Sequence, residues 1–167
     1  MSFFESAVPA YLQMLDSLSK ILDKAEAHAT AKKIDPSVLL GTRLYPDMLP
    51  LSRQVQVACD QATRGCARLT QVEPLSVPDT ETTIAELKAR LSKTMDYVKA
   101  FTPAQFEGAA ERDVTFPIGG GNTRTLKGQQ YLSSFSLPNF YFHVAIAHGI
   151  LRMCGVEIGK RDFLGAN

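Results

Sequence analysis

The chain has 167 residues, enough for one domain and hardly for two, and its 45% hydrophobic content is that of an ordinary globular protein. Eighteen basic and seventeen acidic residues leave a formal net charge of +1, so no sequence-wide positive field favours nucleic acid or an anionic membrane as a partner. No apolar run approaches the roughly 18 residues of a membrane span, and no basic stretch precedes an apolar one as in a secretory signal. We therefore expect a single cytoplasmic domain over residues 1–167 that binds neither nucleic acid nor membrane.

The first helix is predicted over residues 3–33, where apolar residues recur at a 4-3-4-3-4 spacing that is typical of one face of a helix. This apolar face comprises Tyr11, Leu15, Leu18, Leu22, Ala25 and Ala29. Residues 34–50 carry three prolines and a glycine, which indicates a structured connection with one short helical turn after Asp35-Pro36.

A second helix is predicted from about Asp47 to Leu69, with Pro50 in its first turn, and a third from about Thr80 to Phe101. Their apolar faces comprise Val55, Cys59, Ala62, Cys66 and Leu69 in the second helix, and Ile84, Leu87, Leu91, Met95 and Val98 in the third. The small residues of the second helix would let a neighbouring helix approach closely.

Between residues 108 and 128 the pattern changes to the alternation of a β-strand, with Val114, Phe116 and Ile118 separated by other residues. A Gly-Gly-Gly-Asn stretch at 119–122 follows, and we expect a small β-hairpin with this tip. A phosphate-binding loop is the alternative, but no Gly-Lys-Ser/Thr follows the glycines.

The last helical stretch is predicted from about 126 to 154, with Pro138 expected to end one helix or kink it. Beyond Pro138 the inward positions are Phe140, Val144, Ala147, Leu151 and Cys154. The segment that follows has two apolar residues and can fold back on the helices. The fold class is therefore all-α: a four-helix bundle with a small β-hairpin between helices three and four.

Asn139 and His143 are the most informative polar pair in the sequence. They lie four residues apart on one face of the last helix, where two side chains can share a ligand, and they flank inward positions. They form either an interior polar pair that ties helices together or part of a binding site. Gln54 and Gln56 on the second helix could meet them across the bundle, and His148 is five residues from His143, too far around the helix to share an ion with it.

The sequence lacks the residue patterns that several kinds of catalytic site require. Asp60 is the one acidic residue near the inward positions of the second and last helices and is expected to be exposed, so the paired inward glutamates of a di-iron bundle are missing. There is no Gly-x-Ser-x-Gly elbow. The three cysteines form no Cys-x-x-Cys pair, and each is expected to be a buried apolar residue, with a reactive thiol as the alternative. His28 is expected to be a structural or surface residue.

Two stretches of the chain resemble an uncharacterised bacterial family of unknown function. The first is RLYPDMLPLSRQVQ at 43–56. The second is PNFYFHV at 138–144, with its continuation LRMCGVEIGKRDFLG at 151–165. That family is similar to the DinB and YfiT-like proteins, four-helix bundles that are often classed as metalloenzyme candidates and often dimerise. The resemblance implies a metal held by one histidine of the second helix and a His-x-x-x-His pair on the last helix. These positions fall near Gln54 or Gln56 and on Asn139 and His143.

Only one of the three histidines is therefore present, and amides are poor ligands for zinc or nickel beside imidazole. We expect no cofactor; if a divalent metal such as zinc or nickel binds, its ligands would be His143 with Gln54 and Asn139. The function predicted first is binding of a small polar ligand in a vestigial metal-site pocket between helices two and four, lined by Gln54, Gln56, Asn139, Tyr141 and His143, with Tyr131 also possible. The alternatives are a metal- or thiol-dependent hydrolase or transferase, and a self-associating stress or regulatory protein. A homodimer is expected.

Overall fold

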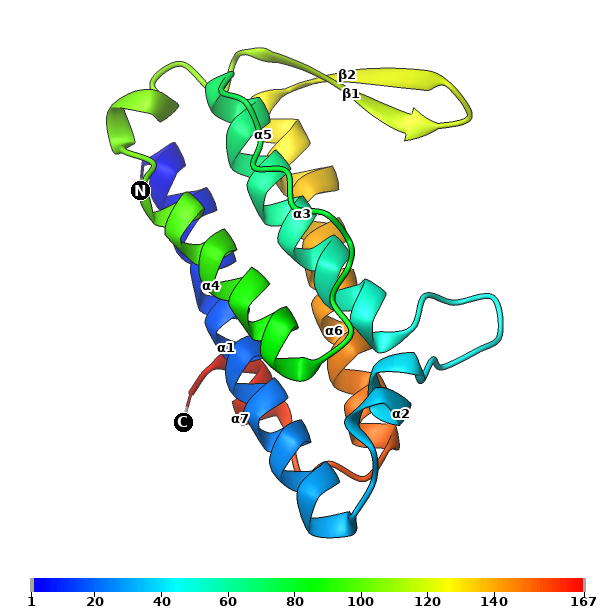
Figure 1. The fold of residues 1–167 in the computed structure, drawn as a ribbon. Coiled ribbons are helices and arrows are strands. Elements are labelled where there is room, and N and C mark those ends of the chain that lie inside the picture. The colour runs from blue at the N-terminus through cyan, green and yellow to red at the C-terminus, as the bar shows by residue number, and fades with distance from the viewer. Residues whose placement is uncertain (1, 167) are drawn as a thin grey trace.

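Four long helices run side by side through the computed structural model, which describes residues 2–166 (Figure 1). They are α1 (Phe3–Lys32), α3 (Leu51–Thr70), α4 (Ile84–Lys99) and α6 (Leu137–Met153). Helix α3 packs against both α6 and α4, and α1 packs against α4 and α6. The prediction of a mostly helical protein with a small hairpin is confirmed.

The apolar spacing of the first helix buries the residues that it predicted to be buried, because a repeat of four and three residues keeps them on one face. All six of them are buried: Tyr11, Leu15, Leu18, Leu22, Ala25 and Ala29. Helix α1 begins at a capping box, in which the Ser2 hydroxyl accepts from the Glu5 amide and the Glu5 carboxylate accepts from the Ser2 amide.

The connection after α1 contains the short helix α2 (Pro36–Gly41), as predicted, and the Asp35 carboxylate accepts a hydrogen bond from the Ser37 amide at its start. Helix α3 begins at Leu51 and not near Asp47, with Pro50 preceding it as its cap residue. Proline disfavours a helical conformation in the residue before it, so Leu49 cannot easily belong to the first turn.

Helix α4 begins later than predicted, at Ile84, because Thr83 and Glu86 form a second capping box there. After a short 3₁₀ turn, η1 (Pro103–Phe106), the chain enters an antiparallel hairpin of β1 (Asp113–Gly119) and β2 (Asn122–Lys127).

The hairpin projects from the end of the helices beside α5 (Figure 1). Val114 and Phe116 are buried, at 3% and 1% exposure, but Ile118 is 53% exposed. The alternation of apolar residues therefore predicts the strand, but its third member, Ile118, is not buried. The pairing of the strands shifts between Pro117 and Gly119, and this part of the hairpin extends beyond the helices.

The last helical stretch comprises α5 (Gly128–Tyr131), a π-helical segment η2 (Leu132–Ser136) and α6, without an intervening loop. The predicted interruption at Pro138 is a change of helix type and not a loop, because α6 begins at Leu137 with Pro138 in its first turn. The Leu137 amide donates to the Leu132 carbonyl five residues earlier, so the turn before Pro138 is wider than in an α-helix. A wider turn can hold the carbonyl of residue 134 away from the proline ring, which would otherwise clash with it.

A buried hydrogen bond of 2.7 Å joins the hydroxyls of Tyr11 on α1 and Ser136 at the end of the π segment. Gly65 of α3 lies against both groups and has no side chain to displace them. At the other end of the molecule, α7 (Lys160–Leu164) packs against α1, and Val156 and Ile158 are buried before it. Within residues 2–166, no helix has the length and apolar character needed to cross a membrane.

Candidate functional site

Among the five predicted site residues, one pair is joined by a hydrogen bond. The Nδ1 atom of His143 on α6 lies 2.8 Å from Oε1 of Gln54 on α3. Nε2 of Gln54 donates to the Leu49 carbonyl at 3.0 Å, so its oxygen faces the histidine and accepts from Nδ1–H. Burial lowers the pKa of His143, so its ring is neutral at pH 7.

These two hydrogen bonds connect α6, α3 and the connection that precedes α3. Gln54 is only 2% exposed, and its two bonds occupy both ends of its amide. This is the arrangement of an interior polar pair that ties helices together, one of the two alternatives predicted for His143, but its partner is Gln54 and not Asn139.

Gln56 lies on another side of α3 from Gln54, because two residues rotate a helix by about 200°. Its amide accepts from Arg53 at 2.7 Å and donates to Glu81 at 2.8 Å. It therefore belongs to an ionic cluster between α3 and α4 and not to a space shared with His143.

Arg90 of α4 is the centre of this ionic cluster, with a side chain only 1% exposed. Its guanidinium pairs with the carboxylates of Asp60 at 2.7 Å, Asp79 at 2.9 Å and Glu81 at 3.1 Å, and it donates to the Pro78 carbonyl at 3.2 Å. The cluster fastens the connection between α3 and α4 to both helices. Asp60 was predicted to be exposed, but its side chain is only 22% exposed, because it forms these ion pairs.

Tyr141 is half-buried, packs its ring on Phe140 at 5.8 Å between centroids, and has its pKa raised by burial. Among the described residues, no hydrogen bond joins it to Gln54 or His143. Tyr131 is fully buried at the other end of the last helical stretch.

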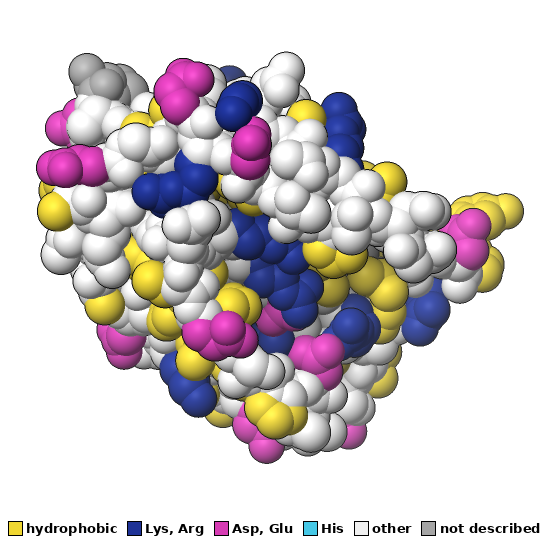
Figure 2. All heavy atoms as spheres, turned by 90° about the horizontal axis from the view of Figure 1, so that it is seen from above, with side chains coloured by type: hydrophobic (Ala, Val, Ile, Leu, Met, Phe, Trp, Pro, Cys, Tyr) yellow, Lys and Arg dark blue, Asp and Glu magenta, His cyan; other side chains and the backbone are white. Residues whose placement is uncertain are grey.

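Asn139 lies in a different place, a groove of about 330 Å³ between α3, the hairpin and the start of α6. We call this space the α3–α6 groove. Its lining residues are Gln61, Arg64, Arg68, Pro117, Ile118, Phe135 and Asn139. On the face that carries the hairpin, Figure 2 shows basic side chains gathered in a hollow, with hydrophobic and acidic side chains beside them.

One aromatic residue, Phe135, lines the α3–α6 groove, and it packs on two buried rings behind it. The Phe135 ring lies 4.3 Å from that of Phe116 and 5.8 Å from that of Tyr131. The Arg68 guanidinium lies over Phe116, 5.9 Å from the ring centroid, and donates to the Tyr131 hydroxyl at 3.2 Å. Cationic and apolar groups thus meet at one surface.

Two amides of the groove have free hydrogen-bonding capacity. Oε1 of Gln61 is buried and has no partner within residues 2–166. Over the same residues, no hydrogen bond involves the side chain of Asn139. Sequence reasoning found Asn139 but missed Gln61, Arg64 and Arg68, although three polar residues spaced three and four apart beside the apolar face of α3 could have indicated them.

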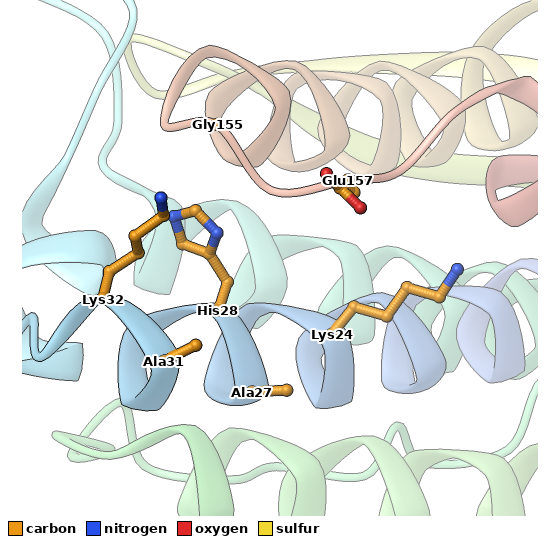
Figure 3. Close-up of a pocket in the computed structure, with 7 residues that line it drawn as sticks. All are labelled: Lys24, Ala27, His28, Ala31, Lys32, Gly155 and Glu157. Carbon is orange, nitrogen blue, oxygen red and sulfur yellow. The ribbon is translucent and has the colours of Figure 1, made fainter.

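A larger hollow of about 560 Å³ lies between α1 and the segment that follows α6. Figure 3 shows His28 and Lys32 side by side on α1, with Glu157 on the segment after α6. No buried polar atom without a partner lies in this hollow among the described residues. His148 is also structural, since its Nε2 lies 3.2 Å from the Gly159 carbonyl and its ring packs on Phe163.

The residues present do not fit the divalent metal that the family resemblance implies. In the part of the chain that the structure describes, no three His, Cys, Asp or Glu side chains are grouped so that they could hold an ion. The Gln54 oxygen already accepts from His143, and Asn139 lies in the groove. We therefore derive no chemistry through a metal.

Two of the three cysteines are also unsuited to thiol chemistry. Cys59 and Cys66 are buried, and burial raises the pKa of each thiol to about 12. Both are therefore protonated at neutral pH, when a thiolate is the nucleophile that such an enzyme needs.

Comparison with known proteins identifies the family. Residues 3–164 match the sequence profile of a domain of unknown function, DUF1993. The chain belongs to the DUF1993 family. This DUF1993 protein is also similar to a crystal structure of a DinB family member protein from Shewanella denitrificans. The two chains share 44% identity with a TM-score of 0.91, over 98% of this chain and 92% of the other. No curated protein matches the DUF1993 protein significantly.

Proposed function

We propose that this DUF1993 protein is a DinB-like four-helix bundle that binds a small polar ligand in the α3–α6 groove. The observation that carries the proposal is the convergence of two guanidinium groups, Arg64 and Arg68, and the unpartnered amide of Asn139 beside the ring of Phe135. A volume of about 330 Å³ is within the range of sites for small molecules. Apolar walls with a few converging polar groups are typical of such sites.

The π-helical segment supports the same location. Phe135 lies within this segment and Asn139 follows it by three residues, and both line the groove. Single π-helical turns occur often at functional sites, because they redirect side chains that a regular α-helix would point elsewhere.

Ligand binding is tested by titration with four fragments, followed in ¹H–¹⁵N correlation NMR spectra: benzoate, benzamide, benzylamine and phenyl phosphate. We expect at least one to shift the amide signals of residues 61–68 and of Ile118 together. Asn139→Trp, which fills the groove, should abolish these shifts. Ala145→Trp, which adds the same ring at an exposed position of α6, should preserve them. Absence of binding by all four, or shifts outside the groove that survive Asn139→Trp, would refute the proposal.

We also propose that the protein is cytoplasmic, because its three cysteines are free thiols, as is usual in a reducing compartment.

We further propose that the protein forms a homodimer through an apolar face of α6. Phe142 and Met153 are 53% and 56% exposed, and their separation of eleven residues places them on one face of the helix. Sedimentation velocity should give a dimer for the wild type and a monomer for Phe142→Lys; a monomeric wild type at high concentration would refute this proposal.

A further inference from the structure

Arg68 is a half-buried cation without an acidic partner. Its interactions are the hydrogen bond to the Tyr131 hydroxyl and the contact with the Phe116 ring. Across residues 2–166, no carboxylate forms an ion pair with it. A buried or partly buried charge is normally paired, because removing it from water is costly.

The other charges near the groove balance one another. Arg64 lies 2.9 Å from Asp60, which also pairs with Arg90. Three guanidinium groups face three carboxylates in this cluster: Arg53, Arg64 and Arg90 against Asp60, Asp79 and Glu81. One positive charge, that of Arg68, is therefore left over in the α3–α6 groove.

We propose that the α3–α6 groove binds a monocarboxylate that carries an apolar body and a hydroxyl group, an inference that rests on the proposed function. The guanidinium of Arg68 matches a carboxylate in charge and in its planar, two-donor geometry. The apolar body of the ligand packs on Phe135 and Ile118, and its hydroxyl forms a hydrogen bond with the side-chain amide of Asn139, which has no other partner among the described residues.

The charge count distinguishes a carboxylate from a phosphate monoester. A carboxylate carries one negative charge and neutralises Arg68. A phosphate monoester carries between about 1.5 and 2 negative charges at pH 7, and the excess would have to compete with Asp60 for Arg64. The groove therefore favours a monoanion.

The inference is tested by titration with 3-hydroxybenzoate, with its neutral amide 3-hydroxybenzamide, and with phenyl phosphate. We expect the carboxylate to bind about tenfold or more tightly than the amide, as for a hydrogen bond to a charged group, and more tightly than the phosphate. Arg68→Met should remove this preference. Arg161→Met, which removes the same charge from an exposed position on α7, should leave it unchanged.

Because Arg68→Met also deprives the buried Tyr131 hydroxyl of its donor, a second pair of variants avoids the core. Ile118→Glu adds a negative charge at the exposed edge of the groove, and Ile118→Gln adds a polar group of similar size. We expect Ile118→Glu to bind 3-hydroxybenzoate about two- to fivefold more weakly than Ile118→Gln, from Coulomb repulsion at a solvated surface.

The outcomes separate this inference from the proposed function. Equal binding of 3-hydroxybenzoate and its amide at the groove would overturn the carboxylate inference and leave small-ligand binding intact, and tighter binding of phenyl phosphate would do the same. Absence of binding by every probe would overturn both.

Discussion

Replacing Gly65 by alanine tests how closely α1, α3 and the π segment are packed. A Cβ atom at Gly65 would lie 2.3 Å from the Tyr11 hydroxyl oxygen and 2.8 Å from the Ser136 hydroxyl oxygen. Both distances are shorter than real contacts of such atoms allow, so the Tyr11 hydroxyl must move. The buried hydrogen bond of 2.7 Å between Tyr11 and Ser136 would then break.

The expected magnitude combines three terms. Leaving buried hydroxyls without partners costs about 1–3 kcal/mol, and forcing a methyl group into a packed core costs about 1–3 kcal/mol. Alanine regains about 1 kcal/mol over glycine through helix propensity. Gly65→Ala should therefore lower the free energy of unfolding by about 1–5 kcal/mol, with a central value near 3 kcal/mol.

Urea unfolding followed by circular dichroism measures this change, and Gly149→Ala is the matched control. Gly149 also lies within a helix, but its nearest neighbour would be Leu44 Cδ1 at 3.9 Å, an ordinary contact. That variant should be stabilised by about 0.5–1 kcal/mol. If both alanine variants are equally stabilised, the packing argument for Gly65 is refuted.

A double-mutant cycle identifies the responsible atom. Tyr11→Phe removes the hydroxyl oxygen at 2.3 Å, while the ring carbon at 2.8 Å remains. Gly65→Ala should therefore cost less in the Tyr11→Phe background, by about 1 kcal/mol or more, as for residues in contact. Additive effects would show that the Tyr11 hydroxyl is not what the new methyl group displaces.

Four further outcomes are expected. Arg90→Met should lower the free energy of unfolding by about 3–5 kcal/mol, because it leaves Glu81, the most buried carboxylate of the cluster, without a cationic partner. Arg161→Met should have no measurable effect, and a loss below 1 kcal/mol for Arg90→Met would contradict the cluster's role. Gly128→Ala should cost about 3 kcal/mol in the same assay, since its Cβ would lie 1.9 Å from the Ala109 carbonyl oxygen, and an unchanged midpoint would be inconsistent with that contact. Burial lowers the pKa of His143 in the folded state, so the unfolded state takes up a proton first as the pH falls. Stability should therefore decrease as the pH drops below 6.5, the ordinary pKa of histidine. Melting temperatures between pH 7.5 and 5 should show this decrease in the wild type and a smaller one in His143→Asn. Native mass spectrometry with added zinc or nickel should detect no stoichiometric ion, whereas an ion that is lost in His143→Ala would restore the metal hypothesis.

The helices were predictable because their signal is local. The 4-3 spacing of Tyr11, Leu15 and Leu18 defines a face without reference to any other part of the chain, and that face is buried. The hairpin was equally readable from Val114, Phe116 and the glycines at its tip. Element starts were less predictable, because the chain has several capping residues close together and only the structure shows that Thr83 is used.

The candidate site was less predictable because it depends on contacts between distant segments. The positions of Gln54 and Gln56 on either side of Val55 do not show that one meets His143 and the other Glu81. Asp60 was expected to be exposed, since nothing local indicates that Arg90, thirty residues later, approaches it. The groove around Asn139 also requires the position of the hairpin, which no helical periodicity supplies.

The π-helical segment places a proline inside a continuous helical stretch without changing the directions in which the flanking residues face. One turn of it contains one residue more than a turn of α-helix, as the hydrogen bond from the Leu137 amide to the Leu132 carbonyl shows. Removing one residue between 132 and 136 would therefore convert the wide turn into a regular one and leave Phe140, Val144 and Ala147 directed into the core. The proline ring would then meet the carbonyl four residues before it. A deletion here should therefore have its cost at Pro138 and not in the packing of the last helix.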